Sequence, residues 1–168
     1  MYKIVLMNGG AKEYEAVLKS FNDTEDNQER KYAMFSLGAT NDPALKKRTL
    51  DWAVKSGAVK LQDFFYPLGA VSSNGAGAAM AWAYFQENFD LIKEKLSKAS
   101  PSLMDAVIIN CISRFCTTAR ADEIEAYFEA HPLPNSARRL AQSVENMRTS
   151  AQMLEAISKS QLATAAFW

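Results

Sequence analysis

Hydrophobic residues recur along this chain every three to four positions, and the alternation typical of strands is nearly absent. In the segment from Ala11 to Phe21, the side chains of Tyr14, Val17 and Leu18 fall on one helical face together with that of Phe21. Comparable patterns predict further helices over residues 25–37, 43–55, 61–71, 74–89, 91–96, 101–116 and 122–130, and from residue 136 to beyond 154. The pattern therefore predicts an all-α protein.

Capping and turn residues fall at the expected helix ends. Asp42 can accept hydrogen bonds from the first free N–H groups of the helix that follows, and Pro43 suits its first turn. Ser56 and Gly57 are typical of the end of that helix. The helix expected over residues 101–116 is apolar on most sides, which predicts a place in the middle of the fold.

Alternate helices are expected to begin near residues 11, 43 and 75, and again near 102 and 135, about 32 to 34 residues apart. This spacing is typical of stacked antiparallel helical hairpins, in which each pair buries its apolar faces only against its neighbours. No linker or low-complexity stretch interrupts the pattern. We therefore expect residues 1–168 to form a single helical domain, an α-α superhelix of the HEAT or armadillo kind.

Charge and cysteine content exclude several partners. The 168 residues carry 19 basic and 19 acidic side chains, so the net charge is zero and neither nucleic acid nor an anionic membrane is expected to bind. No apolar run approaches the roughly 20 residues that span a bilayer. Cys111 and Cys116 are five positions apart, about 7.5 Å along a helix axis and pointing in different directions, which is beyond disulfide reach. Unpaired cysteines favour a reducing, cytoplasmic location.

The glycine-rich segment VSSNGAGAAMAWAYF, residues 71–85, raises the question of nucleotide binding, because such turns before helices can cradle phosphates. A dinucleotide-binding fingerprint needs a preceding strand and a third glycine or alanine, where this chain has Met80. A P-loop needs a Gly-Lys-Ser/Thr ending, which is absent. The sequence therefore argues against a nucleotide site.

Helix packing explains the same segment better. Gly77, Ala78 and Ala81 form a small surface that a neighbouring helix can approach, while Trp82 and Phe85 fill an adjacent groove. The Ser-Ser-Asn-Gly turn that precedes them is then a connector.

Candidates for catalysis or metal binding are few. His131 is the only histidine and lies in a His-Pro-Leu-Pro turn. One histidine with two helical cysteines has the wrong geometry for zinc, and cysteines in an apolar helix are inert. We therefore expect no catalytic residue and no metal ligand in this chain.

Arg138, Gln142 and Glu145 stand four and three positions apart, so they share one face of the last helix. This face is either a solvated surface with an intrahelical network or a polar stripe that lines a groove or cavity.

Three short motifs, in this order and spacing, are typical of one family. The first is Gln-Asp, at Gln62 and Asp63. The second is Ala-Trp-x-x-Phe, at Ala81, Trp82 and Phe85. The third is Arg-x-x-x-Gln-x-x-Glu, at Arg138, Gln142 and Glu145. Together with the stretches LGATNDPALKKRTLDWAVKSGAVKLQDFFYPLGAV and FCTTARADEIEAYFEAHP, they make the chain, from about Tyr2 to Leu154, resemble the C-terminal helical domain of zinc aminopeptidases of the puromycin-sensitive and aminopeptidase N type.

The resemblance implies a non-catalytic role. The zinc motif H-E-x-x-H of those enzymes lies in an earlier domain and is absent here, so the chain is expected to be no enzyme on its own, and zinc is expected only in the catalytic domain of a parent aminopeptidase. The helical domain would form a wall of the peptide-binding cavity and close over the catalytic domain. The residues then expected at the cavity, or in polar contacts between helices, are Ser73, Asn74, Arg138, Gln142 and Glu145; those expected to be structural are Gln62, Asp63, Trp82 and Phe85.

The expected partners are the catalytic and preceding helical domains of the parent, together with its peptide substrate. The chain resembles roughly the last half of the helical domain, so we expect an exposed apolar face at Tyr2, Ile4 and Val5, through which a dimer could form. The alternative function is an independent HEAT-like protein–protein interaction module. A cavity wall should carry polar residues on its concave face, whereas an interaction module should carry exposed aromatic residues there.

Overall fold

The computed structural model of the chain describes residues 1–73 and 75–163. In these ranges the chain forms α-helices and short 3₁₀ helices, and no strand, which confirms the all-α prediction. The elements, in order, are α1 (Tyr2–Asn8), α2 (Ala11–Asp23), α3 (Asn27–Leu37), α4 (Pro43–Lys55), η1 (Leu61–Asp63), α5 (Phe65–Val71), α6 (Gly75–Glu87), α7 (Phe89–Leu96), α8 (Pro101–Ile112), α9 (Thr118–Ala130), η2 (Pro134–Ser136), α10 (Ala137–Ser158) and η3 (Gln161–Ala163).

The helix ends follow the capping residues closely. The Asp42 carboxylate accepts hydrogen bonds from the backbone N–H groups of Ala44 (2.7 Å) and Leu45 (3.3 Å). Gly57, just beyond α4, has a φ of +77°, a conformation that favours glycine. The expected helical start and stop signals around α4 are therefore confirmed.

Several predicted helices have different bounds. The helix expected over 122–130 begins four residues earlier, at Thr118, and those expected over 25–37, 74–89 and 91–96 differ by one or two residues at an end. The helix expected over 61–71 is divided into η1 and α5, because Pro67 has no N–H to donate to the carbonyl of Asp63 and an α-helical bond cannot form there. The helix expected over 101–116 ends at Ile112, so Cys116 lies in the segment before α9 rather than in the apolar helix.

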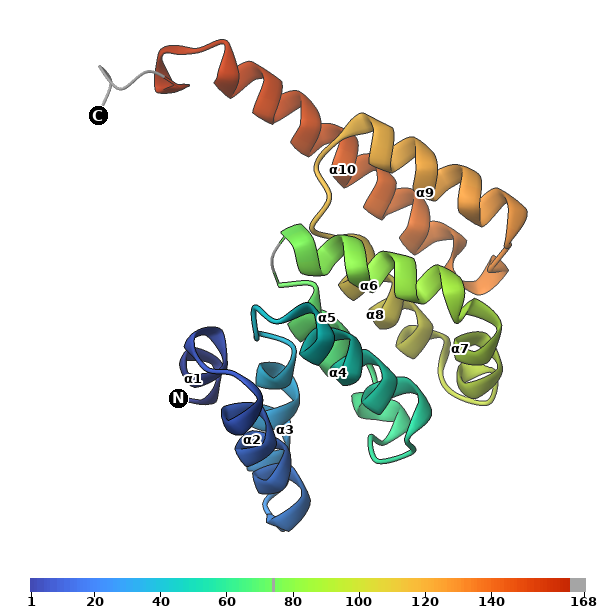
Figure 1. The fold of residues 1–168 in the computed structure, drawn as a ribbon. Coiled ribbons are helices and arrows are strands. Elements are labelled where there is room, and N and C mark those ends of the chain that lie inside the picture. Colours follow the sequence, from blue (N-terminus) through green and yellow to red (C-terminus); the bar gives the residue numbers. More distant parts are fainter. Residues whose placement is uncertain (74, 164–168) are drawn as a thin grey trace. The chain divides into compact units, whose positions relative to one another are not determined.

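The chain divides into two compact units, residues 1–114 and residues 115–168. In unit 1 the helices lie in two rows (Figure 1). The second row consists of α3, α5 and α8, with α5 in contact with both of the others; the first consists of α2, α4 and α6, which pack on α3, α5 and α8, respectively. The superhelical course proposed for the whole chain remains a prediction.

The short helix α7 changes the expected alternation. The helices that begin at residues 11, 43 and 75 all belong to the first row, as the spacing predicts. The helix that begins at residue 101 packs against α5 and α6 and belongs to the second row, because α7 takes the intervening place in the chain. The buried residues of α8 are Met104, Val107, Ile108, Cys111 and Ile112, which lie on one face, and the central place predicted for this helix remains a prediction.

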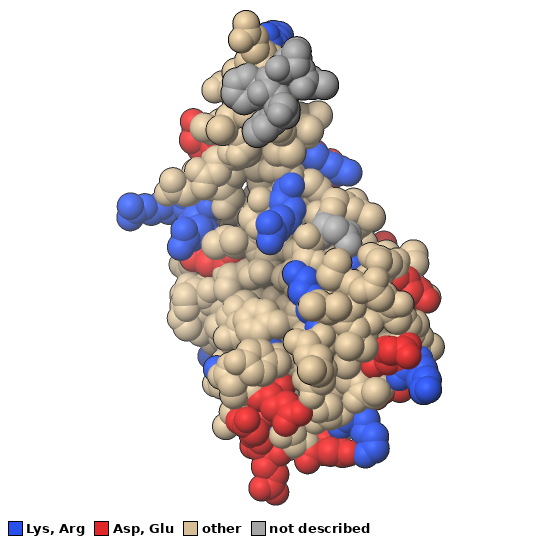
Figure 2. Space-filling model, turned by 90° about the vertical axis from the view of Figure 1, so that its left-hand side faces the viewer, with Lys and Arg blue, Asp and Glu red and all other residues tan. Residues whose placement is uncertain are grey.

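The first helix, α1, presents an apolar face to solvent. Ile4 is 70% exposed and Val5 39% exposed, and Figure 2 shows a predominantly uncharged surface on this side of the molecule. Tyr2 was expected in the same face but is partly buried, because its hydroxyl donates to the Glu29 carboxylate (2.7 Å) and contacts the Ser20 hydroxyl (2.7 Å). The expected apolar face is therefore present without Tyr2.

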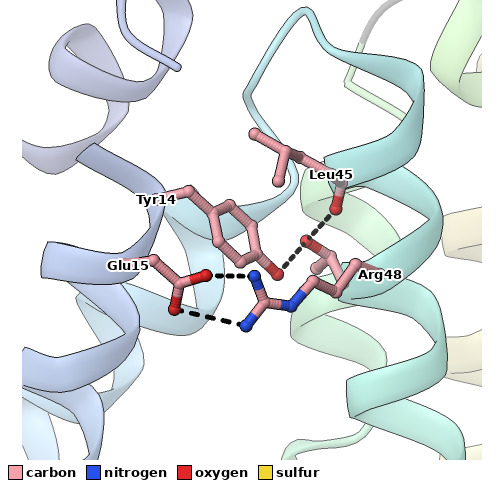
Figure 3. Close-up of polar contacts among 5 residues, drawn as sticks. Tyr14, Glu15, Leu45 and Arg48 are labelled. Atoms are coloured by element: carbon pink, nitrogen blue, oxygen red, sulfur yellow. Dashed lines mark hydrogen bonds and ion pairs between the residues drawn. The ribbon is translucent and has the colours of Figure 1, made fainter. Parts of the chain in front are cut away.

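Helices α2 and α4 are tied together by one buried and one exposed polar contact (Figure 3). The hydroxyl groups of Tyr14 and Thr49 form a hydrogen bond of 2.9 Å, and Thr49 in turn donates to the carbonyl of Leu45 (2.9 Å). Burial raises the pKa of Tyr14. On the surface, the Arg48 guanidinium binds both carboxylate oxygens of Glu15.

Unit 2 is a helical hairpin of α9 and α10 joined through η2. The apolar stripe of α10 is buried at Leu140, Val144 and Met147 but is 49% exposed at Leu154. The stripe thus continues along α10 beyond its buried part. No helix in the described ranges is long and apolar enough to cross a membrane.

Candidate functional site

The turn between α5 and α6 contains the two residues expected at a substrate cavity, Ser73 and Asn74. Ser73 is half-buried, and its backbone N–H donates to the carbonyl of Ala70 (3.3 Å). Asn74 lies outside the described residues. The preceding residue, Ser72, is buried, so exposure to solvent increases from Ser72 to Ser73.

A close contact with α8 holds the end of α5. The Ser72 hydroxyl donates to the carbonyl of Asn110 (2.5 Å), with the Gly69 carbonyl 3.2 Å away. A Cβ atom at Gly69 would lie 2.2 Å from Oδ1 of Asn110, so a larger residue here would displace this side chain. The Asn110 amide is oriented by its Nδ2, which donates to the Ala106 carbonyl (2.8 Å).

A buried lysine holds the same end of α5 from the other side. Lys46 is only 3% exposed, and its ammonium group donates to the carbonyls of Gly38 (2.8 Å) and Val71 (3.4 Å). Burial lowers the pKa of Lys46. Both acceptors lie at helix C-termini, where the helix dipole favours a cation. Among the described residues, no carboxylate pairs with this ammonium group.

The two helix ends that Lys46 joins are in direct backbone contact. A Cβ atom at Gly38 would lie 2.2 Å from the backbone nitrogen of Val71. The φ of Gly38 is −78°, which any residue can adopt, so glycine is needed here for space and not for conformation. We call this set, Gly38, Lys46, Val71, Ser72 and Asn110, the α5 junction.

The α5 junction is suited to holding a loop rather than to reacting. It provides one cation, and its backbone carbonyls already accept hydrogen bonds from Lys46 and Ser72. Among the described residues of the junction, no nucleophile is paired with a base. The nearest thiol in sequence to Asn110, Cys111, is fully buried, and desolvation raises its pKa to about 12, so it stays a thiol at neutral pH.

A zinc ion, which the aminopeptidase resemblance implies for the parent, does not fit the donors of this chain. Nδ1 of His131 donates to the Tyr127 carbonyl (2.9 Å), and the His131 ring stacks on that of Tyr127 with centroids 4.2 Å apart. Nowhere in residues 1–73 and 75–163 do three His, Cys, Asp or Glu side chains gather as a ligand set.

The polar face predicted on the last helix lies in unit 2. Arg138, Gln142 and Glu145 are all exposed on α10. In the described part of the chain, no hydrogen bond or ion pair joins these three side chains, so the intrahelical network, one of the two alternatives, is not formed.

The motif residues expected to be structural divide into two groups. Trp82 and Phe85 are buried in α6 and stack on each other, with ring centroids 5.7 Å apart. Gln62 and Asp63, by contrast, lie in η1 at the surface, where they line a small pocket.

Sequence reasoning did not find Lys46 or Asn110, and it included Ser72 only as part of the Ser-Ser-Asn-Gly turn. One signal for Lys46 was present: Lys46, Leu50 and Ala53 are spaced by four and three residues, which places the lysine on a buried helical face. Nothing comparable identifies Asn110 as the partner of Ser72.

Paired helices in two rows, with anchored turns between them, define an all-α helical domain in unit 1. The family is shown by direct comparison: a family model described as ERAP1-like C-terminal domain matches residues 1–149. The chain therefore belongs to the ERAP1-like C-terminal domain family.

Curated relatives are aminopeptidases. The chain is 33% identical over 144 residues to aminopeptidase M1-B of Oryza sativa subsp. japonica, covering 86% of this chain and 16% of the relative. It is 27% identical over 157 residues to alanine/arginine aminopeptidase of Saccharomyces cerevisiae (90% and 18%) and 28% identical over 140 residues to endoplasmic reticulum aminopeptidase 1 of Rattus norvegicus (80% and 14%). The chain thus spans about one sixth of the length of these relatives.

Proposed function

We propose that this chain is the non-catalytic C-terminal helical portion of a zinc aminopeptidase, in which it forms a wall of the peptide-binding cavity and closes over the catalytic domain. In this proposal residues 1–168 act as one helical domain, and zinc is bound by the catalytic domain of the parent. The half-buried Ser73, presented on the α5 junction, is the observation that carries the proposal.

The α5 junction supports this role because a cavity wall must hold its loops in place while substrate enters and leaves. Contacts from α4 and α8 fix the last turn of α5, and Ser73 follows immediately. A positioned loop on a rigid scaffold is a common way to bring polar groups to a substrate. Arg138, Gln142 and Glu145 are the proposed polar contributors from α10, where their side chains are free to meet a peptide.

The first test is hydrolysis of an aminoacyl-coumarin substrate by the purified chain, with and without zinc. We expect no turnover in either condition. Zinc-dependent turnover would show that the chain is itself a metallopeptidase and would overturn the proposal.

The second test places Ser73→Trp in an intact aminopeptidase that contains this domain. We expect kcat/KM for a long peptide to fall several-fold while hydrolysis of the small aminoacyl-coumarin changes little, because only the long peptide reaches the wall. Ser102→Trp, at an exposed site near the start of α8, is the matched control. Equal effects of the two variants on both substrates would contradict a role for the turn.

One observation favours the second candidate function, an independent interaction module. Helix α3 exposes two aromatic side chains, Tyr32 (57%) and Phe35 (50%). If they contact a partner protein, Tyr32→Ser with Phe35→Ser should abolish capture of that partner by the isolated chain. In the cavity-wall proposal, the same double variant should affect only the intact peptidase.

The exposed face of α1 is proposed to contact preceding helices of the parent, since the relatives are about six times longer than this chain. In the isolated chain, the same face would join two copies. Light scattering after size exclusion should then show a dimer that Ile4→Glu dissociates; a monomer at high concentration would exclude dimerisation. A cytoplasmic location belongs to the same proposal and is supported by the two free cysteines.

A further inference from the structure

A small pocket lies in unit 1 where α3, together with the end of α2, meets η1 and the segment that precedes it. Its volume is about 210 Å³, below the 300–1,000 Å³ typical of sites for drug-sized ligands. Six polar side chains line it, namely Asn27, Arg30, Lys31, Lys60, Gln62 and Asp63. We call it the basic pocket, because three of the six are cations and only one is an acid.

Arg30 is held in place before any ligand arrives. Its Nε donates to the Thr24 carbonyl (3.0 Å), and its guanidinium carbon lies 5.9 Å from the centroid of the Phe21 ring. These contacts leave the two terminal nitrogens of the guanidinium for another acceptor. A planar pair of N–H donors matches two oxygens of one oxyanion.

The cations of the basic pocket differ from several others in unit 1. Lys19 pairs with Asp23, Arg48 with Glu15 and Lys55 with Asp51. Among the described residues, Arg30, Lys31 and Lys60 have no carboxylate partner within ion-pair distance. Three unneutralised cations around one hollow create a local positive potential, although the chain as a whole is neutral.

We propose that the basic pocket binds a small oxyanion of the phosphate class. Arg30 binds two of its oxygens, and Lys31 and Lys60 supply the remaining positive charge. Asn27 and Gln62 offer neutral amide donors. Asp63 opposes the negative charge and limits the affinity. The Gln-Asp pair, which the sequence suggested to be structural, is thus part of a binding site.

The test is a titration of the full 168-residue chain, followed through backbone amide shifts at constant ionic strength. A phosphoryl group can arrive as a free ion or as an ester, so one arm uses inorganic phosphate and the other O-phosphoserine. We expect saturable shifts at residues 27–31 and 60–63 in at least one arm, and the arm with the higher affinity identifies the source. The absence of saturable shifts in both arms would overturn the proposal.

Charge variants test which residues are responsible. Arg30→Gln should weaken binding about tenfold, because it removes two charge-assisted hydrogen bonds. Lys60→Gln should weaken it about threefold, and because the Lys60 side chain is exposed, this variant is informative even if Arg30→Gln unfolds the chain. Lys12→Gln makes the same charge change at an exposed site outside the pocket and should leave the affinity unchanged.

Asp63→Asn should change the phosphate affinity in the opposite direction. Removal of the only carboxylate that lines the pocket should tighten phosphate binding about fivefold. Weaker binding of inorganic phosphate by this variant would overturn the assignment, because removal of an opposing carboxylate should favour an anion. None of these measurements involves peptide hydrolysis, so their outcome is independent of the proposed cavity wall.

Discussion

Helices meet in two different ways in the two units. At the α5 junction in unit 1, backbone touches backbone: Gly38 leaves no room for a Cβ against Val71, and a buried ammonium joins the two helix ends. In unit 2, α9 and α10 meet through side chains. Their contact consists of an apolar stripe with Arg148 bridging Asp122 and Glu125 at the surface.

These two kinds of helix contact should differ in how well they tolerate amino-acid substitutions. Side-chain contacts lose free energy in proportion to the atoms removed, and neighbours can shift to fill part of the gap. A backbone contact has no such freedom, because an added methyl group must displace a helix. The α5 junction should therefore respond steeply to small changes, whereas the α9–α10 hairpin should respond gradually.

The largest effect is expected for Gly38→Ala. The new methyl group would meet the Val71 nitrogen at 2.2 Å, so the variant should lose about 3 kcal/mol of unfolding free energy. Urea unfolding followed by circular dichroism measures this loss. Gly75→Ala is the matched control, because a Cβ atom there meets nothing within 4 Å. A loss below that of an ordinary surface substitution would show that α3 and α5 can separate freely.

Met147→Ala comes next, in unit 2. Met147 is 2% exposed, and truncating a buried methionine costs about 2 kcal/mol or more. Leu154→Ala, on the same stripe but half exposed, should change the unfolding free energy by no more than about 0.5 kcal/mol. Equal losses for the two variants in the same urea assay would mean that the end of α10 is buried in solution.

A third, smaller effect is expected for Lys46→Met, which leaves the Gly38 and Val71 carbonyls without their donor. At neutral pH we expect a loss of about 1 kcal/mol, since the unsatisfied acceptors are partly offset by the removal of a buried charge. Lys12→Met, at an exposed site, should cost less. A stabilised Lys46→Met variant would show that the ammonium is not needed at the junction.

The difference in unfolding free energy between wild type and Lys46→Met should depend on pH in a definite direction. Burial lowers the pKa of Lys46 in the folded chain, so between that pKa and the ordinary value near 10.4 the unfolded chain binds more protons. Wild-type stability from this group therefore rises with pH across that window, and Lys46→Met lacks the rise. The difference in unfolding free energy between wild type and variant should grow on going from neutral to alkaline pH.

Local sequence rules predicted much of this fold. The Asp42 cap, the close of α4 at Gly57 and the burial of Trp82 and Phe85 follow from capping chemistry, turn conformation and helical spacing, all of which act over a few residues. The row of helices that begin at residues 11, 43 and 75 also follows from spacing alone.

The candidate site was less predictable, because it depends on contacts between distant segments. Gly38 looks like a helix terminator, yet its role is to let Val71 approach, 33 positions further on. Lys46 carries a charge, which usually indicates a surface position, and only its partners show why it is buried. The place of Gln62 and Asp63 in a pocket likewise requires Arg30, from another helix.

The smallest effect is expected at the surface of unit 2. Arg148→Gln removes the bridge to Asp122 (2.8 Å) and Glu125 (2.7 Å), and these two carboxylates are what raise the pKa of Arg148. Exposed ion pairs are screened by salt, so the loss of stability should be measurable at low ionic strength and should vanish near 1 M NaCl. Urea midpoints of wild type and variant at the two salt concentrations test this. A loss that persists at high salt would mean that the Arg148 side chain contributes through packing, so that α9 and α10 would be joined by the apolar part of this side chain as well as by their apolar stripe.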